Sequence, residues 1–129
     1  MFKDFWKWHK KKEQINNIAE APLFHEREIW FCHLGNNVGT EEDGSGKDFL
    51  RPILILRKYN KDALTVVPLT RRRKDTEHYY SFETSDGKST AILSQTRLVD
   101  ARRLSYLVST INKEDFQALK EKLRVLLKL

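Results

Sequence analysis

The sequence predicts an α+β domain: a small, bent, mainly antiparallel barrel with one helix after its last strand and another before its first. Three observations support this fold class. Six or seven short apolar or alternating segments are separated by turn residues, as in antiparallel sheets. A stripe of apolar residues with helical spacing closes the chain, and a second such stripe opens it. We therefore divide the chain into an N-terminal helical extension, residues 1–22, and a barrel domain, residues 23–129.

Length and composition limit the class of protein. The 129 residues suffice to bury the core of one domain. The formal charge of +6 and the pI near 9.5 favour an acidic partner, with nucleic acid ahead of an acidic protein. A single cysteine, Cys32, excludes an internal disulfide and, without a secretory apolar segment, indicates the cytoplasm. No apolar run approaches the roughly 20 residues of a membrane span, so no membrane insertion is expected.

Residues 1–21 predict an amphipathic helix. Its apolar positions are Phe2, Phe5, Trp6, His9, Ile15 and Ile18, with lysines between them. We expect this aromatic face to dock on the rest of the chain or on a dimer partner, although basic helices with Trp and Phe also bind membrane surfaces. Pro22 is the predicted end, because the residue before a proline is biased away from helical conformation.

The first predicted strand, residues 28–34, leads into a long loop, residues 35–50. Cys32 and His33 are adjacent on this strand and point to opposite faces, so they cannot share a metal ion, and Cys32 is read as a core residue. A loop of this length is usually functional or disordered. Its Gly-Lys pair does not make a phosphate-binding loop, because Asp48 stands where Ser or Thr is required.

The centre of the predicted sheet is a hairpin. Residues 53–56 and 64–69 are apolar runs joined by the turn at 60–62, so both strands are expected to be covered on more than one side. Arg51 and Thr70 then lie side by side at the open end of this hairpin. The basic residues that follow at once are Arg71, Arg72, Arg73 and Lys74. Together they make a candidate anion site, although the run also suits a solvated charged segment and Arg51 suits a strand-edge ion pair.

The acidic run 41–43 suits a solvated loop tip, but the loop that carries it leads directly into Arg51, so one of its carboxylates can reach the guanidinium. After an exposed, mobile connection at 71–78, strands are predicted at 79–82, 90–94, 95–100 and 105–111, with a hairpin turn at 86–88. The C-terminal helix has Asn112 as its N-cap. Its apolar stripe comprises Phe116, Leu119, Leu123, Leu126 and Leu127.

The order of several motifs resembles the PemK/MazF family of toxin ribonucleases. These motifs are Glu28-Ile29-Trp30, Val38-Gly39-Thr40-Glu41, Arg51-Pro52-Ile53-Leu54-Ile55-Leu56, Val67-Pro68-Leu69-Thr70 and Gln95-Thr96-Arg97-Leu98-Val99-Asp100. The resemblance runs from about Glu28 to the C-terminal helix. It implies a Src-homology-3-like barrel related to the gyrase poison CcdB, and a homodimer. It also implies metal-independent, sequence-specific cleavage of single-stranded mRNA without a cofactor, growth inhibition, and neutralisation by an antitoxin with an acidic, disordered tail.

Carried over by position, Arg51 and Thr70 match the family's catalytic Arg and Thr, and Glu41 matches an acidic residue that often follows the loop motif. In the chemistry that this implies, the ribose 2′-hydroxyl is the nucleophile, Arg51 stabilises charge at the phosphorus and Thr70 donates a hydrogen bond to the phosphate. Glu41 orients Arg51 or accepts the 2′-hydroxyl proton.

RNA contacts are predicted for Gln95, for His78 and for residues 71–74. The basic run would track phosphates, and His78 is a second acid or base candidate, although it also suits an exposed loop histidine. The acidic residue that some family members carry before the glutamine is Ser94 here, so a mechanism with that carboxylate as base does not transfer. The link between Glu41 and Arg51 is several residues longer than the short Gly-rich link of the family, and the helix before Pro22 is an extension that many members lack.

Two other functions fit the same barrel. A CcdB-like gyrase poison acts without catalysis, but that branch ends in Trp-Gly-Ile whereas this chain ends in Leu127-Lys128-Leu129. An inactive toxin relative that only binds nucleic acid or a partner would tolerate Arg51→Ala. A ribonuclease would lose its growth inhibition with the same change.

Overall fold

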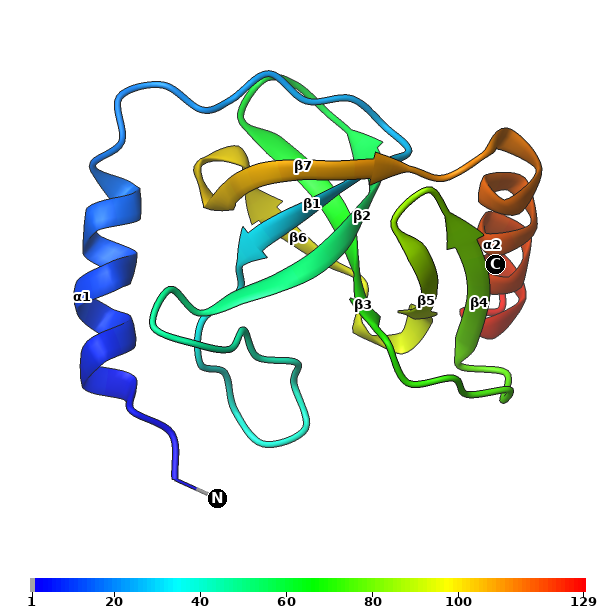
Figure 1. Cartoon of the computed structure of the whole chain (residues 1–129), viewed down its shortest axis with the longest axis horizontal. Coiled ribbons are helices and arrows are strands. Elements are labelled where there is room, and N and C mark those ends of the chain that lie inside the picture. Colours follow the sequence, from blue (N-terminus) through cyan, green and yellow to red (C-terminus); the bar gives the residue numbers. More distant parts are fainter. Residues whose placement is uncertain (1) are drawn as a thin grey trace.

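The computed structural model describes residues 2–129 and confirms the predicted α+β fold class. The elements are α1 (Phe5–Asn16), β1 (Glu28–His33), β2 (Leu50–Lys58), β3 (Ala63–Thr70), β4 (Tyr79–Thr84), β5 (Gly87–Ile92), β6 (Arg97–Asp100), β7 (Leu104–Thr110) and α2 (Lys113–Leu126). Short 3₁₀ turns flank β6. Figure 1 shows α1 and α2 at opposite ends of the molecule, with the sheet between them.

All strand pairs are antiparallel, in the order β4-β5-β3-β2-β1-β7, with β6 added beside β3. One edge of β3 pairs with β2. Its other edge pairs first with β6, over residues 63–66, and then with β5, at Leu69 and Thr70. Among residues 2–129 the order of pairing does not return to its first strand, so the predicted barrel is an open, bent sheet.

The central hairpin of β2 and β3 is buried on both faces, as its apolar runs predict. Ile53 and Ile55 belong to one core cluster, whereas Leu54 between them belongs to the other, because successive side chains on a strand alternate. The helix α2 covers the second cluster with Phe116, Leu119 and Leu123. Asn112 caps α2 as predicted, since its side chain accepts a hydrogen bond from the Asp115 N–H, but Leu127 at the end of the predicted stripe is exposed.

Cys32 is a core residue, as predicted, and is fully buried. Burial raises the pKa of its thiol to about 12, because a thiolate cannot be solvated there.

The predicted docking face of the N-terminal helix is confirmed only at Ile15, which is buried, and the predicted end of the helix is wrong. Trp8, outside the predicted stripe, is 6% exposed, whereas Phe5 and Trp6 are 51% and 69% exposed. Helical periodicity alone allowed either face, and the contacts with Phe49 and with the backbone at Gly35 select the face with Trp8. The helix ends at Asn16 rather than at Pro22. Within residues 2–129, no helix is both long and apolar enough to cross a bilayer.

The loop between β1 and β2 is cross-linked by its own backbone. The Gly44 N–H donates to the Gly35 carbonyl at 2.8 Å, and Ser45 pairs with Leu50. A Cβ atom at Gly44 would lie 1.8 Å from the Phe49 carbonyl oxygen, so this crossing requires glycine. The Asp43 carboxylate accepts a hydrogen bond from the Asn37 N–H at 2.7 Å. These contacts give the loop a defined conformation.

Candidate active site

Arg51 and Thr70 line one open cavity at the end of the central hairpin. Ile53 pairs with Pro68, so Arg51, two residues earlier, lies opposite Thr70, two residues later. The cavity has a volume of about 340 Å³. Its lining residues are Glu42, Arg51, Thr70, Arg72, Lys74, Tyr79 and Ile92. The hairpin thus brings a guanidinium, a hydroxyl and two further cations to one hollow.

Each nitrogen of the Arg51 guanidinium has a protein contact. Nη2 lies 3.0 Å from the Glu42 carboxylate, Nε donates to the Asp43 carbonyl at 2.6 Å and Nη1 donates to the Leu69 carbonyl at 3.0 Å. The side chain is 24% exposed. Because a guanidinium carries five N–H donors, these contacts fix its plane and leave donors for a ligand.

The acidic residue that contacts Arg51 is Glu42, not the predicted Glu41. The Glu41 carboxylate instead accepts a hydrogen bond from the Val38 N–H at 2.8 Å, while the Glu41 N–H donates to the Val38 carbonyl. This turn closes on itself, and within residues 2–129 the contacts of the guanidinium do not include Glu41. The side chains of neighbouring loop residues point in different directions. The acidic run before Arg51 predicts that one of its carboxylates reaches the guanidinium, but it does not indicate which one.

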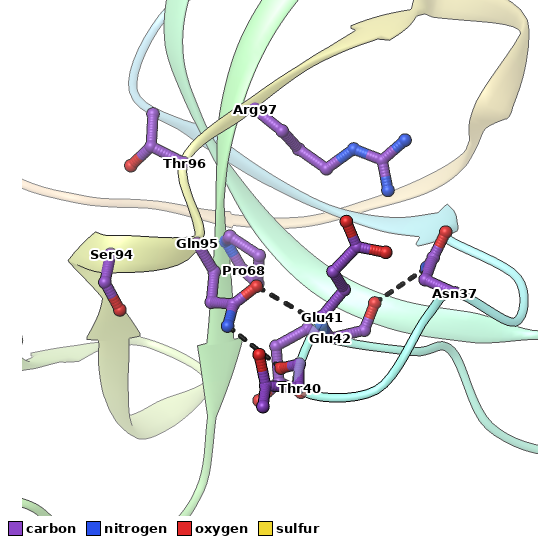
Figure 2. A pocket seen from close by; sticks show the side chains of 9 residues that line it. All are labelled: Asn37, Thr40, Glu41, Glu42, Pro68, Ser94, Gln95, Thr96 and Arg97. Atoms are coloured by element: carbon purple, nitrogen blue, oxygen red, sulfur yellow. Dashed lines mark hydrogen bonds between the residues drawn. The ribbon is translucent and has the colours of Figure 1, made fainter.

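A second cavity, about 490 Å³ in volume, adjoins the first through Glu42, which lines both. Figure 2 shows its lining: Asn37, Thr40, Glu41, Glu42, Pro68, Ser94, Gln95, Thr96 and Arg97. Gln95 accepts a hydrogen bond from the Glu42 N–H at 3.2 Å and donates to the Thr40 carbonyl at 3.1 Å. Gln95 therefore holds the loop at the residue that contacts Arg51. Arg97, at the start of β6, adds a cation for which the sequence analysis assigned no role.

The basic run after Thr70 divides between two places. Arg72 and Lys74 line the Arg51 cavity, and the Arg72 N–H donates to the Thr70 hydroxyl at 3.3 Å. Arg71 instead pairs with Asp86 at 2.8 Å, next to the β4–β5 turn. Arg71 and Arg73 line a separate hollow beside β4 and β5. The predicted cluster of four cations is therefore two pairs on two surfaces.

His78 is not part of the Arg51 cavity. Its ring lies 3.6 Å from the Glu77 carboxylate and is about half exposed. The structure therefore places His78, the second acid or base candidate, outside the cavity that Arg51 lines. It supports the interpretation of His78 as an exposed loop histidine.

Fold and site together define an α+β domain with a basic, hydroxyl-bearing cavity at the end of its central hairpin. The family model described as "PemK-like, MazF-like toxin of type II toxin-antitoxin system" matches residues 25–127. The chain belongs to this family, and the resemblance noted from its motifs is confirmed. Residues 2–24, which include α1, lie outside the match.

Solved structures with the same fold include MazF from Deinococcus radiodurans, which is 20% identical with a TM-score of 0.67 and covers 86% of this chain and 100% of that chain. Toxin MazF-mt6 from Mycobacterium tuberculosis is 18% identical, with a TM-score of 0.61 and coverage of 80% and 98%. An endoribonuclease in complex with its cognate antitoxin, from a mycobacterial species, is 16% identical, with a TM-score of 0.62 and coverage of 84% and 97%. No curated protein matches significantly.

Proposed function

We propose that this chain is the toxin of a type II toxin–antitoxin pair and an endoribonuclease that cleaves single-stranded RNA without a metal ion. The observation that carries the proposal is the cavity in which Arg51 and Thr70 lie with Arg72 and Lys74. Membership of the toxin family supports it. So does the likeness in fold to a mycobacterial protein described as an endoribonuclease in complex with its antitoxin.

In the proposed reaction the ribose 2′-hydroxyl loses its proton and attacks the adjacent phosphorus. The bond from phosphorus to the 5′-oxygen breaks, the 5′-oxygen takes a proton from solvent to become a hydroxyl, and a 2′,3′-cyclic phosphate forms. Arg51 binds the phosphate oxygens with its remaining N–H donors and stabilises the charge that grows in the transition state. Thr70 accepts a hydrogen bond from the Arg72 N–H, so its own hydrogen is free to donate to the phosphate. Arg72 and Lys74 hold neighbouring phosphates.

The two loop carboxylates have different tasks in this proposal. Glu42, at 3.0 Å, orients Arg51. Glu41 keeps the other predicted role, acceptor of the 2′-hydroxyl proton, from the adjoining cavity. RNA bases that enter this second cavity meet Gln95 and Arg97, which extends the predicted RNA-binding role of Gln95 to a second residue.

The proposed partners are a second copy of the chain and an acidic antitoxin. The formal charge of +6 favours a negatively charged segment as ligand. Structures with the same fold include complexes of MazE with MazF from Deinococcus radiodurans.

The test is incubation of the purified protein with several long single-stranded RNAs in EDTA, followed by mapping of the cut ends. Arg51→Ala is the test variant, and Arg57→Ala is its control, because Arg57 lies on the same strand and pairs with Glu26 outside the cavity. The proposal is supported if wild type and Arg57→Ala make discrete cuts that end in cyclic phosphates and Arg51→Ala makes none. Intact RNA from the folded wild type would overturn it in favour of a binding module.

A further inference from the structure

The N-terminal segment, which lies outside the family match, contacts the loop that holds Arg51. Figure 1 shows α1 alongside this loop and away from the end of the molecule that α2 covers. We propose that Lys3 and Trp8 are positioning residues: they hold the loop at 35–50 in place, and the loop in turn holds the Arg51 guanidinium for catalysis. This inference rests on the proposed ribonuclease function.

The contact from Lys3 reaches Arg51 through a single residue. Lys3 Nζ lies 2.9 Å from the Asp43 carboxylate and donates to the Asn37 carbonyl at 2.7 Å. The backbone carbonyl of the same Asp43 accepts the Arg51 Nε–H at 2.6 Å. The ion pair is well covered, since the two side chains are 13% and 25% exposed. It is therefore less screened than the surface pairs that add little to stability.

Trp8 closes the base of the loop. Its ring lies 5.3 Å from the Phe49 ring, centroid to centroid, and 5.6 Å from the Arg103 guanidinium. A Cβ atom at Gly35 would lie 2.0 Å from the Trp8 ring, so the indole packs directly on the loop backbone. Gly35 and Phe49 are themselves joined by a hydrogen bond. Trp8 thus covers both ends of the loop at once.

Two further contacts join the segment to the loop. Lys11 lies 3.4 Å from the Asp48 carboxylate, and the Asn36 side chain donates to the Asp4 carbonyl at 2.9 Å. Arg103, which contacts the Trp8 ring, is itself largely buried. This burial and the nearby charge of Arg97 lower the pKa of its guanidinium. Contacts from the N-terminal segment therefore run along the loop from Asn36 to Phe49.

The loop supplies two of the three contacts that orient Arg51, namely those from Glu42 and Asp43. A catalytic group displaced by about 1 Å can lose on the order of a hundredfold in rate. A loop released at Lys3 keeps the Asp43 to Asn37 hydrogen bond, so we expect partial loss of position rather than collapse. The expected signature is a lower kcat with nearly unchanged RNA affinity, because Arg72 and Lys74 lie on another segment.

The experiment compares Lys3→Met with Lys3→Arg, which keeps the charge, and with Lys10→Met, the removal of an exposed lysine on the solvent side of α1. Cleavage of a short RNA that contains a mapped site gives kcat and KM. We expect Lys3→Met to lower kcat about tenfold and to change KM by no more than about twofold. Lys3→Arg should recover most of the wild-type kcat. Lys10→Met should have the wild-type kcat and the wild-type midpoint of thermal unfolding. Wild-type kcat in Lys3→Met, or an equal loss in Lys10→Met, would overturn the inference.

A second readout does not need RNA cleavage. The Arg51 Nε–H gives a resonance in ¹⁵N–¹H spectra that Arg51→Lys identifies by its disappearance, and its bond to the Asp43 carbonyl should slow its exchange with water. Faster exchange in Lys3→Met and in Trp8→Leu, but not in Lys10→Met, is the expected result. If wild type cleaves no RNA, the proposed function is wrong, but the exchange rate still tests whether Lys3 and Trp8 position the Arg51 guanidinium. Unchanged exchange in Lys3→Met would refute the positioning whatever the activity.

Discussion

The Arg51 Nη2 atom lies 3.0 Å from the Glu42 carboxylate in the cavity that Thr70 also lines. The carboxylate orients the guanidinium, and it also places a negative charge where the RNA phosphate is proposed to bind. A phosphate that approaches Arg51 must therefore tolerate or displace this charge. Removal of the charge should act in opposite directions on RNA binding and on the chemical step.

Glu42→Gln should bind RNA about threefold more tightly, because a like charge near the phosphate is gone, yet lower kcat about tenfold through loss of the charge-assisted contact with Arg51. Binding is measured by fluorescence anisotropy with an RNA whose attacking 2′-hydroxyl is replaced by hydrogen, and kcat by single-turnover cleavage. Weaker binding in Glu42→Gln would contradict this reading.

Glu41→Gln separates the proton acceptor from the orienting group. If Glu41 accepts the 2′-hydroxyl proton, kcat in single-turnover cleavage falls about a hundredfold, a larger loss than the roughly tenfold expected for Glu42→Gln. A wild-type kcat in Glu41→Gln would remove Glu41 from the mechanism.

Thr70→Val should lower kcat about tenfold to a hundredfold with little effect on folding, because it removes one hydrogen bond to the phosphate and nearly conserves volume. Thr65→Val is the matched control on the same strand, where the hydroxyl contacts Tyr59 away from the cavity. Equal activity of the two variants would exclude a direct role for the Thr70 hydroxyl.

Salt dependence should distinguish the two pairs of cations after Thr70. For single-stranded RNA, the slope of log affinity against log salt becomes shallower by about 0.7 for each phosphate that the protein no longer neutralises. Arg72→Ala and Lys74→Ala should each reduce the slope by that amount, whereas Arg71→Ala should leave it unchanged, because Arg71 is paired with Asp86. Titrations of RNA binding from low to moderate salt give the slopes, and a reduced slope in Arg71→Ala would argue for phosphate binding there.

The Cys32 thiol should resist alkylation in the folded protein and react on unfolding. Its folded pKa is about 12, raised by burial from an ordinary value near 9. Because the folded state binds this proton more tightly, the associated stability is complete below about pH 9 and is lost as the pH rises toward 12. Iodoacetamide labelling followed by mass spectrometry, with denaturant titrations at several alkaline pH values, measures both effects. Labelling of the native protein at pH 8 as fast as in denaturant would contradict the burial.

The central hairpin could be predicted from sequence because its determinants are local. Two apolar runs and a polar turn define β2 and β3, and antiparallel pairing then places Arg51 beside Thr70 without any distant contact. The cap of α2 at Asn112 is equally local. These features depend on residues within a few positions of one another, so periodicity and turn chemistry are enough to find them.

Contacts between distant segments decided the rest. Three contacts select which loop carboxylate reaches Arg51: the close backbone crossing at Gly44, the packing of the Trp8 ring on Gly35, and the ion pair of Lys3 with Asp43. The packing of Trp8 on that same loop selects the buried face of α1, where periodicity allowed two faces. Within residues 2–129 the outer strands β4 and β7 do not pair, so the sheet stays open. Local sequence patterns therefore define the central strands and the pair of Arg51 and Thr70. The contacts that hold Arg51 could not be predicted in this way, because loop conformation depends on packing between residues far apart in the chain.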